Sequence, residues 1–177
     1  MIRALVTLVL TLACVSVLYG QAAPTANGPG SYVALGATFS GYESDYGQTL
    51  LGGGTLFVDA NLYRRIGVEA EARISRLHST DDLRESTYLV GPKISTHGRS
   101  LRPYVKFLVG RGEFNFPFNY AQGSYFVIAP GAGLDWRIGR GRLMIRVIDF
   151  EYQEWPMFSY GAIHPYGAST GISFGIF

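Results

Sequence analysis

Residues 68–75 read Val68-Glu69-Ala70-Glu71-Ala72-Arg73-Ile74-Ser75. Apolar and polar side chains alternate along this stretch, and successive side chains of a β-strand point to opposite faces of its sheet. The stretch therefore predicts a strand with one apolar and one charged face. A water-soluble sandwich turns its charged face outward, whereas a membrane β-barrel turns it into the lumen. The direction of Glu69, Glu71 and Arg73 thus separates the two folds, and an inward direction indicates a membrane barrel.

Similar alternation recurs along the chain at a regular spacing. It predicts eight strands, at 31–42, 53–64, 66–77, 86–96, 102–113, 124–138, 141–152 and 165–177. Strands of soluble proteins have about 5–6 residues, whereas a tilted strand needs about 9–11 residues to cross a bilayer. The length and the even number of these strands favour a closed antiparallel transmembrane barrel. We expect these residues to face lipid: Val33, Leu35, Ala37, Val68, Ala70 and Ala72.

The connections between these strands alternate in length and in charge. Short turns are expected near 64–66, 96–102 and 139–141, and longer loops near 43–52, 78–85, 114–123 and 153–164. The short turns carry arginines and no acid: Arg64, Arg65, Arg99, Arg102, Arg140 and Arg142. The long loops carry acids, with Arg84 as their only base: Glu43, Asp45, Asp81, Asp82, Glu85 and Glu154. Short turns at one end and longer loops at the other are typical of membrane barrels.

Aromatic side chains gather near the expected long-loop end, and amphipathic rings favour the headgroup region of a membrane. The group includes Tyr42, Tyr46, Phe114, Phe116, Phe118, Tyr120, Tyr125, Phe126, Phe150, Tyr152, Trp155, Phe158, Tyr160 and Tyr166. Tyr63, Trp136 and Phe177 are expected near the other end. These positions predict two aromatic girdles, although aromatic residues also favour strands in ordinary β-cores.

Residues 1–22 have the pattern of a secretory signal peptide. Arg3 supplies a positive start, Ala4 to Leu18 is an uncharged apolar run, and Gly20 and Ala22 are small residues suited to a cleavage site. An uncleaved anchor, or lipidation at Cys14, is the alternative. Residues 23–177 are expected to form one barrel domain, without cysteine and without a second stretch long enough for a membrane helix.

Composition narrows the function classes. Hydrophobic residues make up 47% of the chain and charged residues 16%, which excludes a disordered protein. The formal net charge is +2 with no basic stripe, so nucleic acid is not an expected partner. An exported chain without a second helical anchor is a soluble periplasmic protein, a secreted protein or a membrane β-barrel.

Several stretches resemble the transmembrane domain of OmpA-type outer-membrane proteins. They are Leu62-Tyr63-Arg64-Arg65-Ile66-Gly67-Val68-Glu69-Ala70-Glu71, Tyr88-Leu89-Val90-Gly91-Pro92-Lys93, Pro103-Tyr104-Val105-Lys106 and Gly131-Ala132-Gly133-Leu134-Asp135-Trp136-Arg137. The resemblance implies an eight-stranded barrel in the bacterial cell outer membrane, without the peptidoglycan-binding domain. It also implies two partners, which are outer-membrane lipid and the barrel-assembly machinery. The last strand departs from the family pattern, since Ile172, Phe174 and Ile176 form its apolar face rather than the residues in register with Phe177.

Alternation also predicts which charged side chains enter the lumen. They are Asp59, Glu69, Glu71, Arg73, Lys93, Lys106, Asp135, Arg137 and Arg146. A bulge near Val147-Ile148 would turn Asp149 and Glu151 inward as well. An eight-stranded barrel is just wide enough for side chains to fill it, and buried charges require partners. We therefore expect a plug of paired charges; a gated polar pathway, or an acid/base site using Glu69 or Glu71, is the alternative.

Catalytic, metal and cofactor motifs are weak. The best hydrolase set combines His78, Ser79, Asp81 and Asp82 with Ser159 and His164, and neighbours in sequence do not make a triad. No histidine pair has metal-ligand spacing, and Asp81, Asp82 and Glu85 lack a complete calcium-loop pattern. Gly52-Gly53-Gly54 lacks the lysine of a phosphate loop and predicts a flexible junction before a strand. No catalytic residue, metal or cofactor is expected.

The sequence therefore predicts an integral outer-membrane barrel with a structural or surface-interaction role and no enzymatic activity. Two alternatives remain: a small barrel enzyme acting on outer-membrane lipid, and a soluble exported barrel that carries an apolar ligand as lipocalins do. Buffer extraction separates the soluble barrel from the other two, and the contacts of His78 or His164 separate the enzyme from the structural barrel.

Overall fold

The computed structural model describes residues 32–45, 49–63, 65–76, 84–96, 100–115, 122–139, 141–157 and 161–176. The predicted signal peptide at 1–22, with Cys14, lies outside these residues, as do His78, His97 and Phe177. Within these ranges, no helix is long and apolar enough to cross a membrane.

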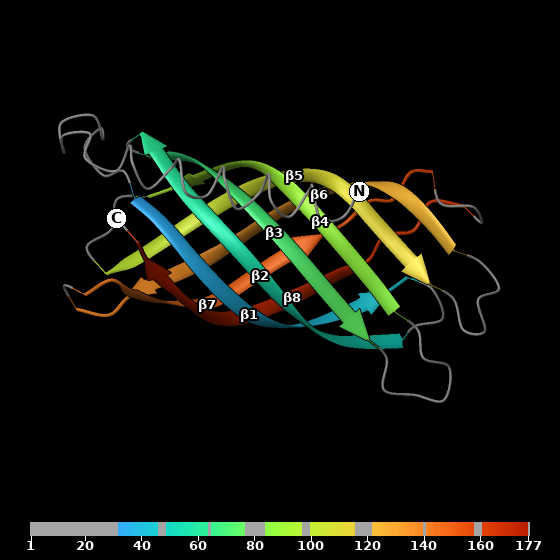
Figure 1. Ribbon diagram of the computed structural model, residues 1–177, viewed down its shortest axis with the longest axis horizontal. Helices are drawn as coiled ribbons and strands as arrows, with labels where there is room; N and C mark the ends of the chain where they lie inside the picture. The colour runs from blue at the N-terminus through green and yellow to red at the C-terminus, as the bar shows by residue number, and fades with distance from the viewer. Residues whose placement is uncertain are drawn as a thin grey trace, which may run out of the picture.

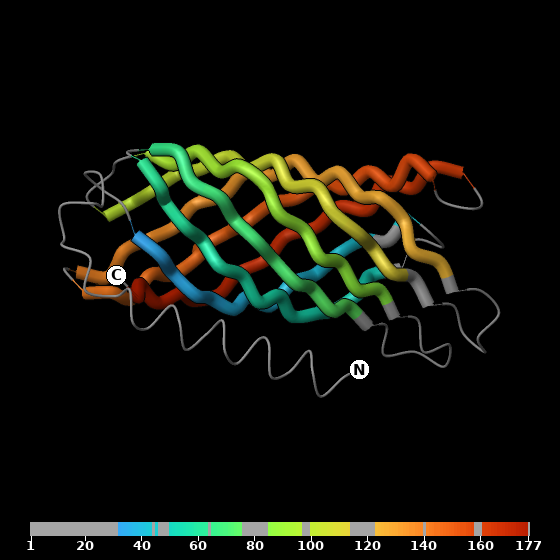
Figure 2. Tube along the Cα trace, turned by 45° about the horizontal axis from the view of Figure 1, so that its top comes forward, coloured from blue at the N-terminus to red at the C-terminus, as the bar shows by residue number. Residues whose placement is uncertain are grey.

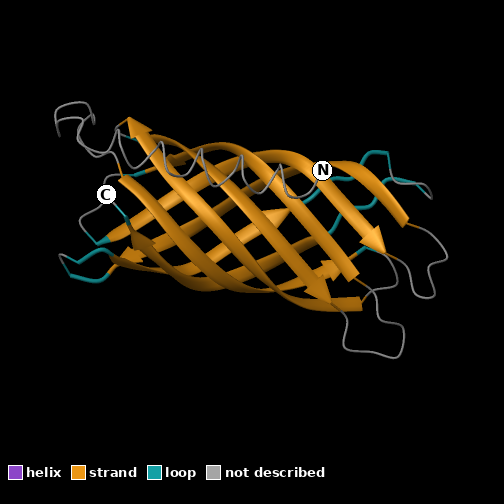
Figure 3. Ribbon diagram, in the orientation of Figure 1, coloured by secondary structure: helices purple, strands orange, loops and turns teal. Residues whose placement is uncertain are grey.

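Eight antiparallel strands form a closed barrel (Figure 1). They are β1 (Tyr32–Ser44), β2 (Thr49–Tyr63), β3 (Ile66–Arg76), β4 (Arg84–Ser95), β5 (Leu101–Asn115), β6 (Gln122–Arg137), β7 (Leu143–Tyr152) and β8 (Tyr166–Gly175). Each strand pairs with its neighbours in the chain, and β1 pairs with β8 from Ala34↔Gly175 to Glu43↔Tyr166. The strands run obliquely around the long axis of the barrel (Figures 2 and 3). The predicted number, order and antiparallel pairing of the strands are confirmed.

The side chains of the third strand point in the directions that indicate a membrane barrel. Glu69, Glu71 and Arg73 face the lumen and are 0%, 5% and 1% exposed. Val68 and Ile74, on the opposite face, are exposed on the outside of the barrel. The exterior carries large apolar side chains on every strand, and the interior carries charges. This arrangement is that of a transmembrane barrel, and it excludes the lipocalin-like alternative, whose lumen would be apolar.

The connections sort by end as predicted, but their lengths differ less than predicted. Those at one end span 64–65, 96–100 and 138–142, and those at the other span 45–48, 77–83, 116–121 and 153–165. The difference in length between the two groups of connections is smaller because β1, β2, β5 and β6 extend further toward the long-loop end than predicted.

The predicted flexible junction at Gly52–Gly54 is wrong, because these glycines lie within β2. Leu50 points outward and Leu51 inward, so the alternation continues before the glycines. A Cβ on Gly53 would lie 2.5 Å from the carbonyl oxygen of Ile74. The glycine therefore allows β2 and β3 to approach closely rather than providing a flexible hinge.

A bulge in β7 redirects the end of that strand. Its pairing with β8 shifts between Arg146 and Asp149, and Val147 and Ile148 both face outward. Asp149 and Glu151 consequently point into the lumen. This is the bulge that the sequence predicts near Val147-Ile148.

Residues 153–155, directly after β7, continue the pairing and the in–out alternation of the barrel wall. Glu154 pairs with Ile128, and Trp155 pairs with Ile163. Trp155 is fully buried inside the barrel and Tyr42 also faces the lumen, so their assignment to a lipid-facing girdle is wrong. For Trp155 the cause is that the bulge fixes which alternate residues after Arg146 point inward. Tyr42 follows the inward alternation of β1, which it shares with Thr38 and Ser40. Other rings of the predicted girdles do face outward, namely Phe126, Phe150, Tyr152 and Tyr166 at one end and Tyr63 and Trp136 at the other.

Ala70 allows the lipid-facing assignment to be tested. It lies near the middle of β3, on the exposed face, and pairs with Val58 and Val90. We expect Ala70→Arg to lower the free energy of unfolding by about 2–4 kcal/mol, because arginine at mid-bilayer is costly. Urea titration in lipid vesicles measures this loss. Ala168→Arg, near the start of β8, is the control and should cost about 0–1 kcal/mol. Equal, negligible losses at both sites would contradict insertion.

Candidate functional site

Lys106, on β5, lies at the centre of a buried cluster of charges in the lumen. Its Nζ lies 3.2 Å from Glu69 Oε1, 3.1 Å from Glu71 Oε2, 2.7 Å from Asp149 Oδ2 and 3.1 Å from Glu151 Oε2. These carboxylates come from β3 and β7, across the barrel from one another. One ammonium therefore links two strands that do not pair directly.

Glu69 is the most heavily paired carboxylate. Arg146 binds it with two nitrogens, at 2.7 Å for Nη2–Oε2 and 3.2 Å for Nη1–Oε1. Lys93 Nζ lies 2.9 Å from Glu69 Oε2 and also contacts Asp59 at 2.8 Å and Asp135 at 3.3 Å. Together with Lys106, three cations surround the Glu69 side chain.

Arg73 extends the network toward the long-loop end. Its Nη2 lies 2.7 Å from Glu71 Oε1 and its Nη1 lies 2.9 Å from Glu151 Oε1. Its Nε donates to Thr55 Oγ1 at 3.1 Å, and its guanidinium lies 4.0 Å from the centre of the Tyr42 ring. Each of the three guanidinium nitrogens of Arg73 therefore has a partner inside the lumen.

Aromatic rings also cover Arg146 and Lys93. The Arg146 guanidinium lies 3.7 Å from the centre of the Phe57 ring, and Lys93 Nζ lies 3.9 Å from that of Tyr104. A cation over the face of a ring is attracted by the negative face of the π-system. These rings therefore fill the space that water would otherwise occupy and add to the ion pairing.

The side chains joined by these contacts form what we call the ion-paired network. Its positive and negative charges are unequal in number. Six carboxylates (Asp59, Glu69, Glu71, Asp135, Asp149 and Glu151) face four cations (Arg73, Lys93, Lys106 and Arg146), so its formal charge is −2. Glu85 is a further buried carboxyl, and its Oε2 has no hydrogen-bond partner in the part of the chain that the structure describes.

Of the lumen residues expected from the sequence, all but Arg137 belong to this network. Arg137 is the last residue of β6, is half-buried at the short-turn end, and forms no ion pair within the described part of the chain. Sequence reasoning did not assign Glu85, Tyr42 or Gln153 to the lumen. Glu85 and Tyr42 share the alternation of neighbouring lumen residues, and that signal could have identified them.

An apolar layer fills the lumen on the long-loop side of the network. It consists of Leu51, Leu89, Leu108, Val127, Ala129, Trp155 and Ile163, all buried. Trp155 Nε1 donates to Gln153 Oε1 at 2.9 Å, and Gln153 Nε2 donates to Glu151 Oε1 at 2.9 Å. The two layers are therefore joined by hydrogen bonds along the inward-facing side of residues 151–155.

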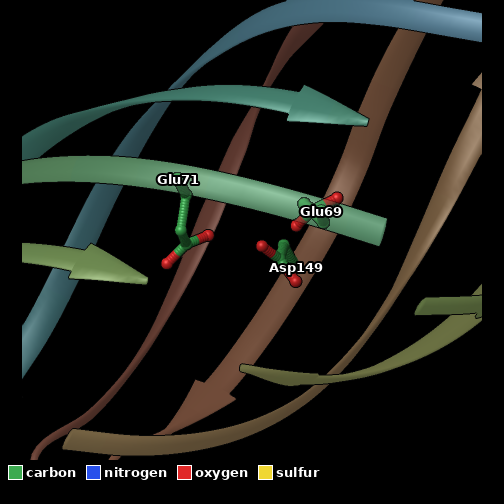
Figure 4. Close-up of side chains that lie close together, drawn as sticks. All are labelled: Glu69, Glu71 and Asp149. Carbon is green, nitrogen blue, oxygen red and sulfur yellow. The ribbon is translucent and has the colours of Figure 1, made fainter. Parts of the chain in front are cut away.

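Three carboxylates of the network lie close enough to hold a metal ion. Glu69 and Glu71 on β3 and Asp149 on β7 point toward one another (Figure 4), with one oxygen of each within 4.8 Å of the others. Lys106 Nζ contacts all three. The ammonium already supplies the positive charge at this point, so the geometry does not call for a metal.

The other predicted chemical sites receive little support. Glu69 and Glu71, the candidate acid/base residues, are buried and bound to cations. The backbone N–H of His164 donates to Asp45 Oδ2 at 3.0 Å, and its ring stacks on Tyr152 at 5.9 Å between centroids. Its Nδ1 has no hydrogen-bond partner within the described residues. His78, Ser79, Asp81, Asp82 and Ser159 lie outside the described residues.

A closed eight-stranded barrel with an apolar exterior and a charged lumen defines a small transmembrane β-barrel. No protein-family model and no curated protein sequence matches the chain.

Solved structures with the same fold are outer-membrane proteins. Neisserial surface protein A is 9% identical with a TM-score of 0.67, and the match covers 82% of this chain and 96% of that one. Ail of Yersinia pestis, solved with the heparin analogue sucrose octasulfate, is 18% identical with a TM-score of 0.52, covering 81% and 97%. The N-terminal barrel of Pseudomonas aeruginosa OprF is 17% identical with a TM-score of 0.52, covering 82% and 99%. The chain therefore has the fold of the small outer-membrane barrels.

Proposed function

We propose that this protein is an integral barrel of the bacterial outer membrane with a structural or surface-interaction role, a closed lumen and no catalytic activity. The observation that supports the proposal is that two layers of buried side chains lie inside the barrel, the ion-paired network and the apolar layer. A pore needs a continuous water path, and an eight-stranded barrel has little room beside its own side chains.

The proposed partners are those that would meet the apolar exterior of the barrel. The apolar exterior suits outer-membrane lipid, and the barrel-assembly machinery would act during insertion. In β8, Ile172 and Phe174 lie on the exterior, and Ile176 continues that face beyond the strand. This is the apolar face that the machinery would meet in the last strand.

The role of the lumen is tested by single-channel recording in planar bilayers. The wild-type protein is expected to show no large stable pore. Trp155→Ala combined with Lys106→Ala removes the largest side chain of the apolar layer and the central cation of the network, and should produce open steps. Phe39→Ala, on the lipid-facing side of β1, is the matched control and should stay closed.

Frequent porin-sized steps in the wild-type protein would refute the plug and favour the gated pathway. The excess of carboxylates would then predict selectivity for cations, which a salt gradient across the bilayer measures as the reversal potential.

A further inference from the structure

Three arginines without acidic partners lie at the short-turn end of the barrel. Arg102 is near the start of β5, Arg137 ends β6, and Arg142 precedes β7. Within the described ranges none of them pairs with a carboxylate, whereas each cation of the ion-paired network contacts at least two. Arg142 Nη1 donates to the carbonyl oxygen of Ile176 at 3.5 Å, and Arg102 Nε is a buried donor without a hydrogen-bond partner among the described residues.

A cavity of about 180 Å³ lies beside two of these arginines, Arg137 and Arg142. It is lined by Tyr32, Arg137, Gly141, Arg142, Met144 and Gly175. The volume has room for several waters, or for a tetrahedral oxyanion with part of its hydration shell.

Backbone hydrogen bonds hold the rim of this cavity. Gly175 N–H donates to the carbonyl oxygen of Arg142 at 2.8 Å, and Arg137 N–H donates to that of Ser100 at 2.8 Å. These bonds tie the end of β8 and the end of β6 to the adjoining turns. The backbone of Arg137 and Arg142 is therefore held in place by hydrogen bonds. This lowers the entropy cost of ordering their side chains around a ligand.

The nearest lumen carboxylates are already committed to other cations. Tyr32 lines the cavity, and its hydroxyl donates to Asp59 Oδ2 at 3.0 Å, so it lies between the cavity and the ion-paired network. Asp59 is paired with Lys93, and Asp135 with Lys93 and Arg146. The Arg102 guanidinium lies 5.3 Å from the centre of the ring of Tyr32, which lines the cavity.

We propose that this cavity binds a phosphate group through Arg137 and Arg142, with Arg102 adding positive charge beside them. The planar fork of a guanidinium matches the oxygens of a phosphate and can bind two of them at once. Bound phosphate would offset the positive charge that these arginines bring to the short-turn end. Residues 23–31, which precede β1, contain no aspartate or glutamate, so that segment offers no side-chain carboxylate in its place.

The phosphate can come from an anionic phospholipid headgroup or from a soluble ion. Ile138 and Leu143 flank the turn that carries Arg142 and are exposed on the outside of the barrel. These apolar side chains place the turn beside the headgroup region of the membrane. Basic pockets at such positions bind anionic lipid headgroups.

The test uses the full chain refolded in micelles of a zwitterionic detergent. Inorganic phosphate and a short-chain phosphatidylglycerol are titrated separately by calorimetry into the wild-type protein, Arg137→Gln and Arg142→Gln. We expect saturable binding to the wild type that either substitution weakens about tenfold or more, because each removes a charge-assisted hydrogen bond. The heat-dependent shift in gel mobility of folded barrels verifies that each variant is folded.

Arg65→Gln is the matched control, since Arg65 is an exposed arginine in the β2–β3 turn that does not line the cavity. It should leave binding unchanged. If both probes bind, the site is supported and a soluble phosphate ion is a sufficient ligand. If only phosphatidylglycerol binds, the site is supported and its ligand is a lipid headgroup. Absence of saturable binding to both probes would overturn the proposal, as would an equal loss in Arg65→Gln, which indicates a diffuse effect of charge.

Discussion

Glu69→Gln is expected to lower the free energy of unfolding by about 3–5 kcal/mol, because it leaves buried cations without their shared partner. Lys93, Lys106 and Arg146 all contact this carboxylate within 3.2 Å. A neutral amide cannot replace that charge among buried cations. Urea titration in lipid vesicles measures the loss.

Glu85→Gln is the control for this substitution. Glu85 is also buried in the lumen, but it forms no ion pair within the described residues, and one of its oxygens lacks a hydrogen-bond partner. Removing its charge should therefore be neutral or stabilising. An equal loss for Glu69→Gln and Glu85→Gln would mean that pairing does not determine the stability of the lumen.

A double-mutant cycle isolates the pairing itself. Glu69→Leu and Arg146→Met each strand a charge, whereas the two together remove one acid and one base that contact each other through two nitrogens. The double variant should lose less stability than the sum of the single variants, by about 0.5–3 kcal/mol. Strictly additive losses would contradict the plug of paired charges.

The strand pattern was predictable because one physical rule governs every strand of a membrane barrel. Each outward position meets lipid, so the alternation seen at Val68, Glu69 and Ala70 had to recur. The prediction failed where side chains are missing: the glycines at 52–54 hid the first residues of β2. Alternation carries no signal through residues that have no side chain.

The lumen residues were predictable from the same alternation, but their partners were not. Lys106 reaches Glu69 from β5 to β3, and Lys93 reaches Asp135 from β4 to β6. Such contacts depend on the stagger of the strands around the barrel, which a single strand does not reveal. Alternation predicts whether a side chain points into the lumen, but not how far along the barrel axis it lies. For this reason the sequence groups Arg137 with the other lumen charges, although it lies at the end of its strand.

Trp155 shows a second limit of reading strands one at a time. The sequence places it in a long loop, and the structure buries it completely inside the barrel. The bulge at Val147 and Ile148 makes Asp149, Glu151, Gln153 and Trp155 face inward in turn. Recognising this requires continuing the alternation beyond the expected end of the strand.

Trp155→Ala is expected to lower the free energy of unfolding by about 3–5 kcal/mol, the usual cost of removing a large buried aromatic side chain. Trp155 packs in the apolar layer, and its indole N–H donates to Gln153. Trp136→Ala is the matched control, because Trp136 lies on the exposed face of β6 and its removal leaves no cavity. Urea titration in vesicles compares the two variants, and a smaller loss for Trp155→Ala would contradict the packing of this layer.

Gly112 provides a test of the same contact from the opposite side. A Cβ on Gly112 would lie 2.2 Å from Cη2 of Trp155, so the indole ring rests directly against this glycine. Gly112→Ala should therefore destabilise the wild-type barrel by about 1–3 kcal/mol through overpacking. In the Trp155→Ala background the added methyl group meets empty space and should cost little or even restore stability. Substitutions of residues in contact change the free energy of unfolding non-additively, whereas substitutions of distant residues are additive. Equal costs of Gly112→Ala in both backgrounds would therefore mean that Trp155 does not contact Gly112 and does not occupy the long-loop end of the lumen.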